Sequence, residues 1–169
     1  MTQPPSSPPT LGLRHAVLWV SDPRLSAQFY QQALGLTVTH ESDSAVFMSS
    51  TASATDHDLG LFKAATHERS APQRIGLYHL AWEVASLADL KSAKQRLTAM
   101  GALVGENNHG TSRSLYANDP DGIEFEVMWE VPLDQVDPDA ITNVPLDFDS
   151  DFAQFGPSAP SRGANKIVG

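Results

Sequence analysis

The sequence predicts an α+β fold made of two βαβββ modules, whose curved sheets lie around a central cleft. Three observations predict it. The strand-like segment LRHAVLWV returns as LYHLAWEV, a segment of helical periodicity follows each copy, and short runs rich in branched and aromatic residues follow each helix. A chain of 169 residues is about one domain long. We therefore expect a single domain that binds a ligand between its two sheets.

The first module is expected over about 11–65. Its opening strand, 13–20, alternates between the two faces. A helix follows, in which Asp22 is the N-cap, Pro23 is the first helical residue and Gly35 ends the helix. The later strand candidates of this module are 36–40, 45–49 and 58–63.

The second module is expected over about 75–131. Its opening strand is 77–84, and Ser86 and Asp89 form a capping-box-like pair at the start of the following helix. The motif Asp-Pro-Asp-Gly at 119–122 favours a tight turn, because proline presets one turn angle and glycine adopts positive φ. The later strand candidates are 102–104, 112–117 and 123–129.

Two segments outside the modules are expected to be arms. Residues 1–10 hold four prolines and no charge, which predicts a disordered N-terminal arm. Residues 132–169 are acidic and rich in proline, which predicts an extended arm that is loose from Gly156 onward. Three phenylalanines within 148–155 share one helical face, so a short helix there would dock on its own body or on a partner subunit.

Two histidines occupy the same place in the repeat. His15 is the third residue of the first opening strand and His79 is the third residue of the second. Related strands would bring the imidazoles to equivalent places beside the cleft, where neutral imidazoles can bind a divalent metal. A single histidine in such a strand is more often only hydrogen-bonded on a half-buried face, but the repeated pair favours a metal site.

The last strand of the second module offers a carboxylate. Alternation places Glu124, Glu126 and Met128 on one face, and a carboxylate in so apolar a strand costs free energy unless it is solvated or paired with a cation. Either glutamate could be a third ligand, and both could instead lie in water at the sheet edge. Two histidines and one carboxylate leave open positions on an ion that suit Fe(II) or Mn(II), although Zn(II) or Ni(II) could bind the same donors.

From Leu11 to about Trp129, the sequence resembles the vicinal oxygen chelate superfamily. This superfamily includes glyoxalase I, extradiol dioxygenases of the catechol 2,3-type, fosfomycin-modifying enzymes and bleomycin-resistance proteins. The resemblance depends on LRHAVLWVSD, LYHLAWEV and above all NHGTSRSLYANDPDGIEFEVMW. It is closest to the extradiol branch, in which a His-Gly pair precedes a Leu-Tyr pair and the DPDG turn.

The resemblance implies three metal ligands and three residues that act on the substrate. The later glutamate of the last strand becomes the third ligand, which selects Glu126 over Glu124. The implied ligands are His15, His79 and Glu126, and the implied substrate residues are His57, Tyr116 and His109.

His57 also has a physical argument of its own. It lies between Asp56 and Asp58, and either carboxylate, if close, would favour the protonated imidazole. A group of this kind suits the proton transfers between a catechol, oxygen and an intermediate. An exposed loop histidine is an equally good interpretation.

The sequence departs from the pattern of glyoxalase-type members at one position that affects the number of metal ligands. In the first module, the position that matches Glu126 falls near Leu61 or Phe62, which are both apolar. A glyoxalase-type site would take a further carboxylate or amide from there. We therefore expect a three-ligand site and not that of a glyoxalase I.

The expected function is a mononuclear metal-dependent enzyme of extradiol-dioxygenase type, with Fe(II), that cleaves a catechol-like substrate with dioxygen. One alternative is an isomerase, lyase or transferase of glyoxalase type that uses the metal as a Lewis acid. Another is a non-catalytic protein of the same fold that sequesters a small molecule such as an antibiotic.

Composition and charge limit the possible partners. The chain has no cysteine, which excludes disulfides, iron–sulfur clusters and cysteine nucleophiles. Its formal net charge of −9 would repel nucleic acids and anionic membranes. No signal peptide or membrane-spanning run is evident, so we expect a cytoplasmic protein. Members of the superfamily often form homodimers, and we expect one here.

Overall fold

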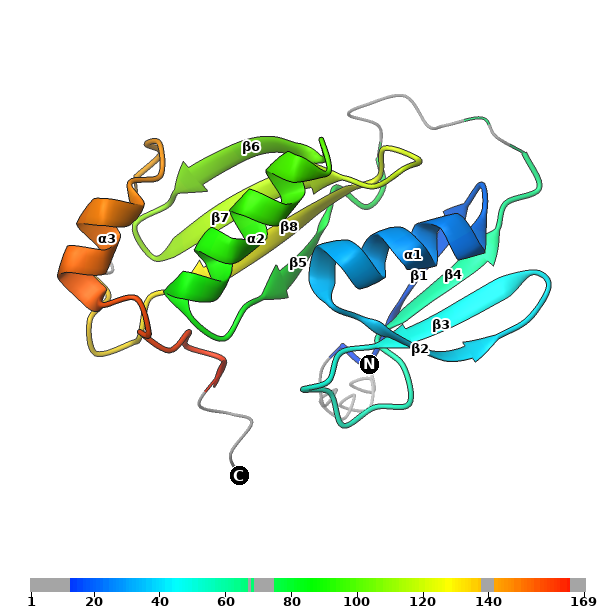
Figure 1. The fold of residues 1–169 in the computed structure, drawn as a ribbon, viewed down its shortest axis with the longest axis horizontal. Coiled ribbons are helices and arrows are strands. Elements are labelled where there is room, and N and C mark those ends of the chain that lie inside the picture. The colour runs from blue at the N-terminus through cyan, green and yellow to red at the C-terminus, as the bar shows by residue number, and fades with distance from the viewer. Residues whose placement is uncertain (1–12, 67, 69–74, 138–141, 165–169) are drawn as a thin grey trace, which may run out of the picture.

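A computed structural model describes residues 13–66, 68, 75–137 and 142–164. These residues form two separate four-stranded sheets, each with one long helix packed on it (Figure 1). The arm predicted at 1–10 lies outside the described residues. Within them, the predicted fold class of two βαβββ modules is confirmed.

The two sheets share one topology, in which the first and last strands of each module pair in parallel and the other neighbours pair antiparallel. The first sheet has the order β1-β4-β3-β2, and the second has the order β5-β8-β7-β6. The first module consists of β1 (Ala16–Val20), α1 (Pro23–Leu34), β2 (Thr37–Glu41), β3 (Ala45–Ser49) and β4 (Leu59–Lys63). The second consists of β5 (Leu80–Glu83), α2 (Leu87–Ala99), β6 (Leu103–Asn108), β7 (Ser112–Asn118) and β8 (Glu124–Glu130).

Both long helices begin at the residues that the sequence predicted. The side chain of Asp22 accepts hydrogen bonds from the backbone N–H groups of Arg24 and Leu25, and Gly35 ends α1 with φ at 72°. The hydroxyl of Ser86 accepts a hydrogen bond from the backbone N–H of Asp89 at the start of α2. These caps satisfy backbone groups that a helix end leaves unpaired.

The two sheets lie side by side, and α1 and α2 contact each other on the same side of them (Figure 1). Side chains beneath the two helices merge into one core. Phe125 of β8 packs edge-on against Phe29 and Tyr30 of α1, with ring centroids 5.9 and 5.7 Å apart. The Tyr30 hydroxyl donates to Asp119 of the DPDG turn at 3.1 Å, which ties the second module to the first. We call the faces that the helices do not cover the open faces of the two sheets.

The described part of the C-terminal arm packs on the second module, and its helix α3 spans Phe148–Phe155. Asp151 forms a buried ion pair with Arg113 of β7, at 2.6 Å. The expectation that the chain is loose from Gly156 is wrong for residues 156–164. The indole of Trp129 donates to the backbone oxygen of Ala159, and Ser161 is fully buried. Composition could not predict these contacts, because each joins residues far apart in the sequence.

Both predicted ligand histidines lie just outside their strands. The structure begins β1 at Ala16 and β5 at Leu80, so His15 and His79 each precede a strand by one residue. The expectation that they are strand residues is wrong by that one position, because ladder pairing with the last strand of each module starts only at Ala16 and Leu80. Their equivalence within the repeat is unaffected. None of the helices in the described residues is long and apolar enough to cross a membrane.

Candidate metal centre

The open face of the second sheet carries histidine and glutamate side chains. His79 precedes β5, and Glu124 and Glu126 alternate along the neighbouring strand β8. The Nε2 atom of His79 lies 3.0 Å from Oε2 of Glu126, and its Nδ1 atom lies 3.3 Å from Oε1 of Glu124. Glu126 is buried, with 8% of its surface exposed. An imidazole nitrogen facing a buried carboxylate oxygen is a donor pair that a divalent metal accepts.

Tyr116 and His109 lie beside this pair. Tyr116 of β7 is opposite Glu126 in the strand register, and its ring centroid is 5.7 Å from that of His79. The Tyr116 hydroxyl and Nε2 of His109 are 2.8 Å apart. Burial raises the pKa of Tyr116 and the charge of Glu126 adds to this effect, so the phenol stays protonated at neutral pH. The structure therefore brings four of the six predicted site residues together on one face.

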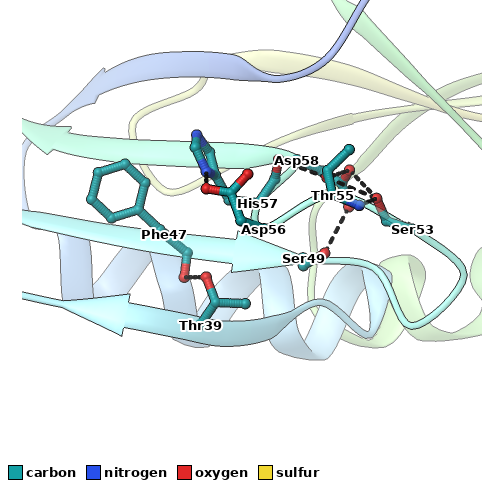
Figure 2. A network of polar contacts seen from close by, with 8 residues as sticks. All are labelled: Thr39, Phe47, Ser49, Ser53, Thr55, Asp56, His57 and Asp58. Atoms are coloured by element: carbon teal, nitrogen blue, oxygen red, sulfur yellow. Dashed lines mark hydrogen bonds and ion pairs between the residues drawn. The ribbon is translucent and has the colours of Figure 1, made fainter.

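The other two predicted residues, His15 and His57, lie on the open face of the first sheet. Their ring centroids are 4.6 Å apart, and His57 also packs edge-on against Phe47 of β3 at 5.0 Å. The Nδ1 atom of His57 is 2.9 Å from Oδ2 of Asp56, and Figure 2 shows this contact. The hydrogen bond to His57 lowers the pKa of the Asp56 carboxyl. Asp56 is therefore the flanking carboxylate that orients the His57 ring.

The second flanking carboxylate, Asp58, holds the loop that carries His57. It accepts hydrogen bonds from the hydroxyls of Ser53 at 2.6 Å and Thr55 at 2.9 Å (Figure 2). It also accepts one from the backbone N–H of Ser50 at 2.7 Å. Burial acts to raise the pKa of Asp58, but these hydrogen bonds outweigh it and lower the pKa. The loop between β3 and β4 thus has a fixed shape, and His57 is presented on it.

The predicted ligand set is divided between the two sheets. Among the described residues, no group of three or more histidine, aspartate and glutamate side chains is arranged to hold a metal ion. His15 lies with His57, whereas His79 lies with Glu126. The helices cover the same side of both sheets, so the two open faces lie next to each other and do not face each other (Figure 1).

Strand pairing identifies the residue of the first sheet that matches Glu126. Val17 and Ala81 each lie two residues after the repeated histidine, and they pair with Gly60 and Glu126 respectively. The matching position is therefore Gly60, and the expectation that it falls near Leu61 or Phe62 is off by at least one residue. Glycine has no side chain to offer as a ligand, and the three-ligand site stays a prediction.

A cavity of about 300 Å³ opens beside His15, where the two modules meet. Its walls come from the start of β1, the loop after β3, and β5. Arg14, Ser50 and Ser53 are among its polar residues, but Glu126 does not line it. The cavity therefore reaches Ala81, the strand partner of Glu126, without being lined by Glu126 itself.

Sequence reasoning did not find the polar residues that support His109. The amide nitrogen of Asn107 is 3.4 Å from Nδ1 of His109 and also donates to the side-chain oxygen of Asn143 in the C-terminal arm. Alternation along β6 could have placed Asn107 and His109 on the same face. No local signal connects either residue to Asn143, which is 36 positions further along the chain.

Comparison with known proteins identifies one family. The model of the Glyoxalase/Bleomycin resistance protein/Dioxygenase superfamily matches residues 12–127. The glutathione transferase FosA of Serratia marcescens is 30% identical over 117 residues, which cover 68% of this chain and 78% of that protein.

Three solved structures illustrate the shared fold. A glyoxylase/bleomycin resistance protein/dioxygenase domain from Frankia sp. EAN1pec has a TM-score of 0.58 at 23% identity, covering 73% of this chain and 100% of that one. A possible glyoxalase from Bacillus cereus has a TM-score of 0.57 at 25% identity, covering 70% and 99%. The fosfomycin resistance protein FosX from Listeria monocytogenes has a TM-score of 0.55 at 21% identity, covering 70% and 93%.

Proposed function

Because this chain belongs to the glyoxalase/bleomycin resistance protein/dioxygenase superfamily, we propose that it is a metal-dependent enzyme of extradiol-dioxygenase type that cleaves a catechol-like substrate with dioxygen. The observation that carries the proposal is the His109–Tyr116 hydrogen bond beside His79 and Glu126. A phenol and an imidazole next to two candidate ligands can hold and move a proton at an oxygen of a chelated substrate. Cleavage of a vicinal diol needs a proton relay of this kind.

The donor groups on the second sheet fit a divalent metal. Nδ1 of His79 and Oε1 of Glu124 are buried and lie 3.3 Å from each other, and neither has a hydrogen bond to any other atom of the described residues. A cation at this face would compensate the charge of the two glutamates, which burial otherwise penalises. We infer that His15, His79 and Glu126 hold Fe(II), with Mn(II), Zn(II) or Ni(II) as alternatives. The ion would orient the substrate oxygens and mediate charge transfer to dioxygen.

Two copies of the chain would complete the ligand set. The open face of the first sheet leaves Trp19 68% exposed and Val17 51% exposed, and Tyr78, next to His79, is 77% exposed. Such apolar surface favours burial in an interface. A symmetric homodimer can place the first sheet of one chain over the second sheet of the other, which forms two equivalent sites. Each site would take His15 from one chain and His79 with Glu126 from its partner.

His57 has a defined part in this arrangement. Asp56 contacts Nδ1 of its ring, which leaves Nε2 as the atom that can exchange a proton with the substrate. The stacking on His15 keeps that ring next to the metal ligand. Phe47 and His57 would then form the wall on which an aromatic ring packs.

A second candidate function is a metal-dependent transfer of glutathione to an electrophile such as fosfomycin. The 30% identity with the FosA glutathione transferase favours it. In that reaction the thiol sulfur forms a bond to an epoxide carbon, the carbon–oxygen bond breaks, and the thiol proton goes to the alkoxide. Tyr116 would donate a hydrogen bond to the epoxide oxygen.

Anaerobic loading with Fe(II), followed by a panel of catechols in air, distinguishes the two functions. We expect a coloured ring-cleavage product, and Tyr116→Phe should lower kcat by about 10²-fold or more without changing the metal content. A parallel sample receives glutathione and fosfomycin in place of the catechol. Full metal occupancy with no cleavage of any catechol would contradict the dioxygenase proposal, and a glutathione adduct would support the transferase.

Subunit complementation tests whether the site lies between chains. His15→Ala and Glu126→Ala chains are each expected to be inactive alone. A mixed dimer places both substitutions in one site and leaves the other site intact, so mixing the two chains should restore activity. No restoration in a mixture shown by mass to contain the heterodimer would place the site within one chain.

A further inference from the structure

The C-terminal arm contacts β6 at the residue just before His109. The backbone N–H of Asn108 donates to the oxygen of Val144 at 2.8 Å, and the N–H of Val144 returns a bond to the oxygen of Asn108 at 3.3 Å. The Thr142 hydroxyl donates to the same Asn108 oxygen at 2.9 Å. This short antiparallel bridge between Asn108 and Val144 holds the backbone of the arm, including the neighbouring Asn143, against the end of β6. The matched family region ends at residue 127, so the arm is an addition to it.

A line of polar side chains runs from the arm to the candidate site. Asn143 accepts a hydrogen bond from the amide nitrogen of Asn107, and the same nitrogen faces Nδ1 of His109 at 3.4 Å. Nε2 of His109 then lies 2.8 Å from the Tyr116 hydroxyl. An amide nitrogen only donates, and a neutral imidazole has one nitrogen that donates and one that accepts. With the Asn107 amide in this orientation, Nδ1 of His109 acts as the acceptor and the ring proton belongs on Nε2.

We propose that Asn143 is a positioning residue that acts through Asn107 to hold His109 as the Nε2–H tautomer, which leaves the Tyr116 O–H free to donate to a substrate oxygen. The consequence for the substrate rests on the proposed function, but the tautomer does not. With the proton on Nε2, His109 donates to the oxygen of Tyr116, and the Tyr116 hydrogen is available outward. With the other tautomer, Tyr116 would donate to His109 and would have no hydrogen left for the substrate.

Asn143 selects the orientation of the Asn107 amide. If the amide were reversed, its oxygen would meet the oxygen of Asn143 and would accept a proton from Nδ1 of His109. A carboxylate in place of Asn107 would have the same effect, because it only accepts. A carboxylate in place of Asn143 would keep the native orientation, because that position acts only as an acceptor.

Nitrogen-15 NMR of the histidine rings, recorded on the metal-free full chain in mildly alkaline buffer, tests the proposal. Wild type should show His109 protonated on Nε2. Asn107→Asp should shift the proton to Nδ1, whereas Asn143→Asp, which adds the same charge, should leave it on Nε2. Asn143→Ala should give a mixture of the two tautomers, and Gln154→Ala, elsewhere on the arm, should not.

An Nδ1–H tautomer in the wild type would overturn the proposal, and so would an unchanged tautomer in Asn107→Asp. A single Nε2–H tautomer in Asn143→Ala would overturn the role of the arm. Because the spectra need neither metal nor substrate, a negative result with the catechol panel contradicts only the dioxygenase proposal. If that panel succeeds, Asn107→Asp should lower kcat as Tyr116→Phe does, and Asn143→Asp should not.

Discussion

The two open faces are built on the same strand register and carry side chains of opposite character. On the open face of the second sheet, the side chains near the repeated histidine are polar. At the corresponding positions of the first sheet, the residues are apolar or have no side chain. The equivalent residues, with the first sheet named first, are Gly60 and Glu126, Phe47 and Tyr116, and Trp19 and Glu83.

For the proposed ligand set, neither sheet alone is a complete site. The second sheet supplies a carboxylate, a phenol and a histidine, and the first supplies a histidine and an aromatic wall. A Cβ atom at Gly60 would lie 3.3 Å from side-chain atoms of Phe62 and Val17, so these two side chains close over the place where the second sheet has Glu126. The duplicated skeleton therefore provides two different halves that can complement each other.

The C-terminal arm makes the two modules differ further. Within the described residues it packs on the second sheet and on α2, and its Ser161 and Gly163 both donate to Glu83. The equivalent position of the first sheet, Trp19, stays 68% exposed. One sheet is thus supported by the C-terminal arm of its own chain, while the other leaves apolar side chains exposed.

Removal of the arm's buried ion pair is expected to have the largest effect. Asp151→Ala leaves the Arg113 guanidinium, which is 5% exposed, without its carboxylate. Breaking a buried pair in this way costs about 3–5 kcal/mol. Urea denaturation should show this loss in the free energy of unfolding, whereas Gln154→Ala on the same helix should change it by about 0.5 kcal/mol or less. An equally small change for Asp151→Ala would mean that the arm does not stabilise the second module.

The two glutamates of the second sheet should differ in metal binding. Glu126→Gln keeps the shape of the side chain and removes its charge, so the dissociation constant for Fe(II) should rise by about 100-fold or more. Glu124→Gln is the matched control, with an expected change of about 10-fold or less. Anaerobic competition with a chromophoric chelator measures both. A larger effect from Glu124 would assign the ligand role to the earlier glutamate.

Local features of the sequence were sufficient to predict the order of the helices and strands. Asp22 and Ser86 mark helix starts by their own hydrogen-bonding chemistry, and the strand candidates follow a period of two residues. The contact of Asp151 with Arg113 spans 38 positions, and no local pattern marks it. The position of the first sheet relative to the second depends on how Phe125 packs with α1, which periodicity does not contain. The repeat therefore predicts that His15 and His79 occupy equivalent positions. It does not show that, within one chain, they lie on the open faces of two different sheets.

The hydrogen bonds that the Asp58 carboxylate accepts in the first module should stabilise the fold at neutral pH. Asp58→Ala removes four hydrogen bonds to a charged acceptor, which come from the backbone N–H of Ser50 and from the hydroxyls of Ser49, Ser53 and Thr55. We therefore expect a loss of about 2 kcal/mol in the free energy of unfolding. Because the pKa of Asp58 is lowered on folding, its contribution is complete above the ordinary aspartate value near 3.9 and is lost as the pH falls through the lowered pKa. The difference between wild type and Asp58→Ala should therefore shrink in strong acid. Asp56→Ala, at the exposed neighbour, should leave the free energy of unfolding nearly unchanged at neutral pH.

The contribution of Asp119 in the second module to the free energy of unfolding should depend on pH in the opposite direction to that of Asp58. At neutral pH its substitution should have a smaller effect than Asp58→Ala. Burial raises its pKa, although the N–H groups of Asp121 and Ile123 and the Tyr30 hydroxyl all donate to it. Asp119→Asn keeps an acceptor for the two N–H groups, so we expect a change of about 1 kcal/mol or less at neutral pH. The folded wild type binds a proton more readily than the unfolded chain, so its stability relative to Asp119→Asn should grow as the pH falls from neutral through the raised pKa. Urea titrations of both proteins across this range measure the difference. A difference that shrinks on acidification would show that Asp119 behaves like Asp58, and that the two modules do not differ in how they bury their turn carboxylates.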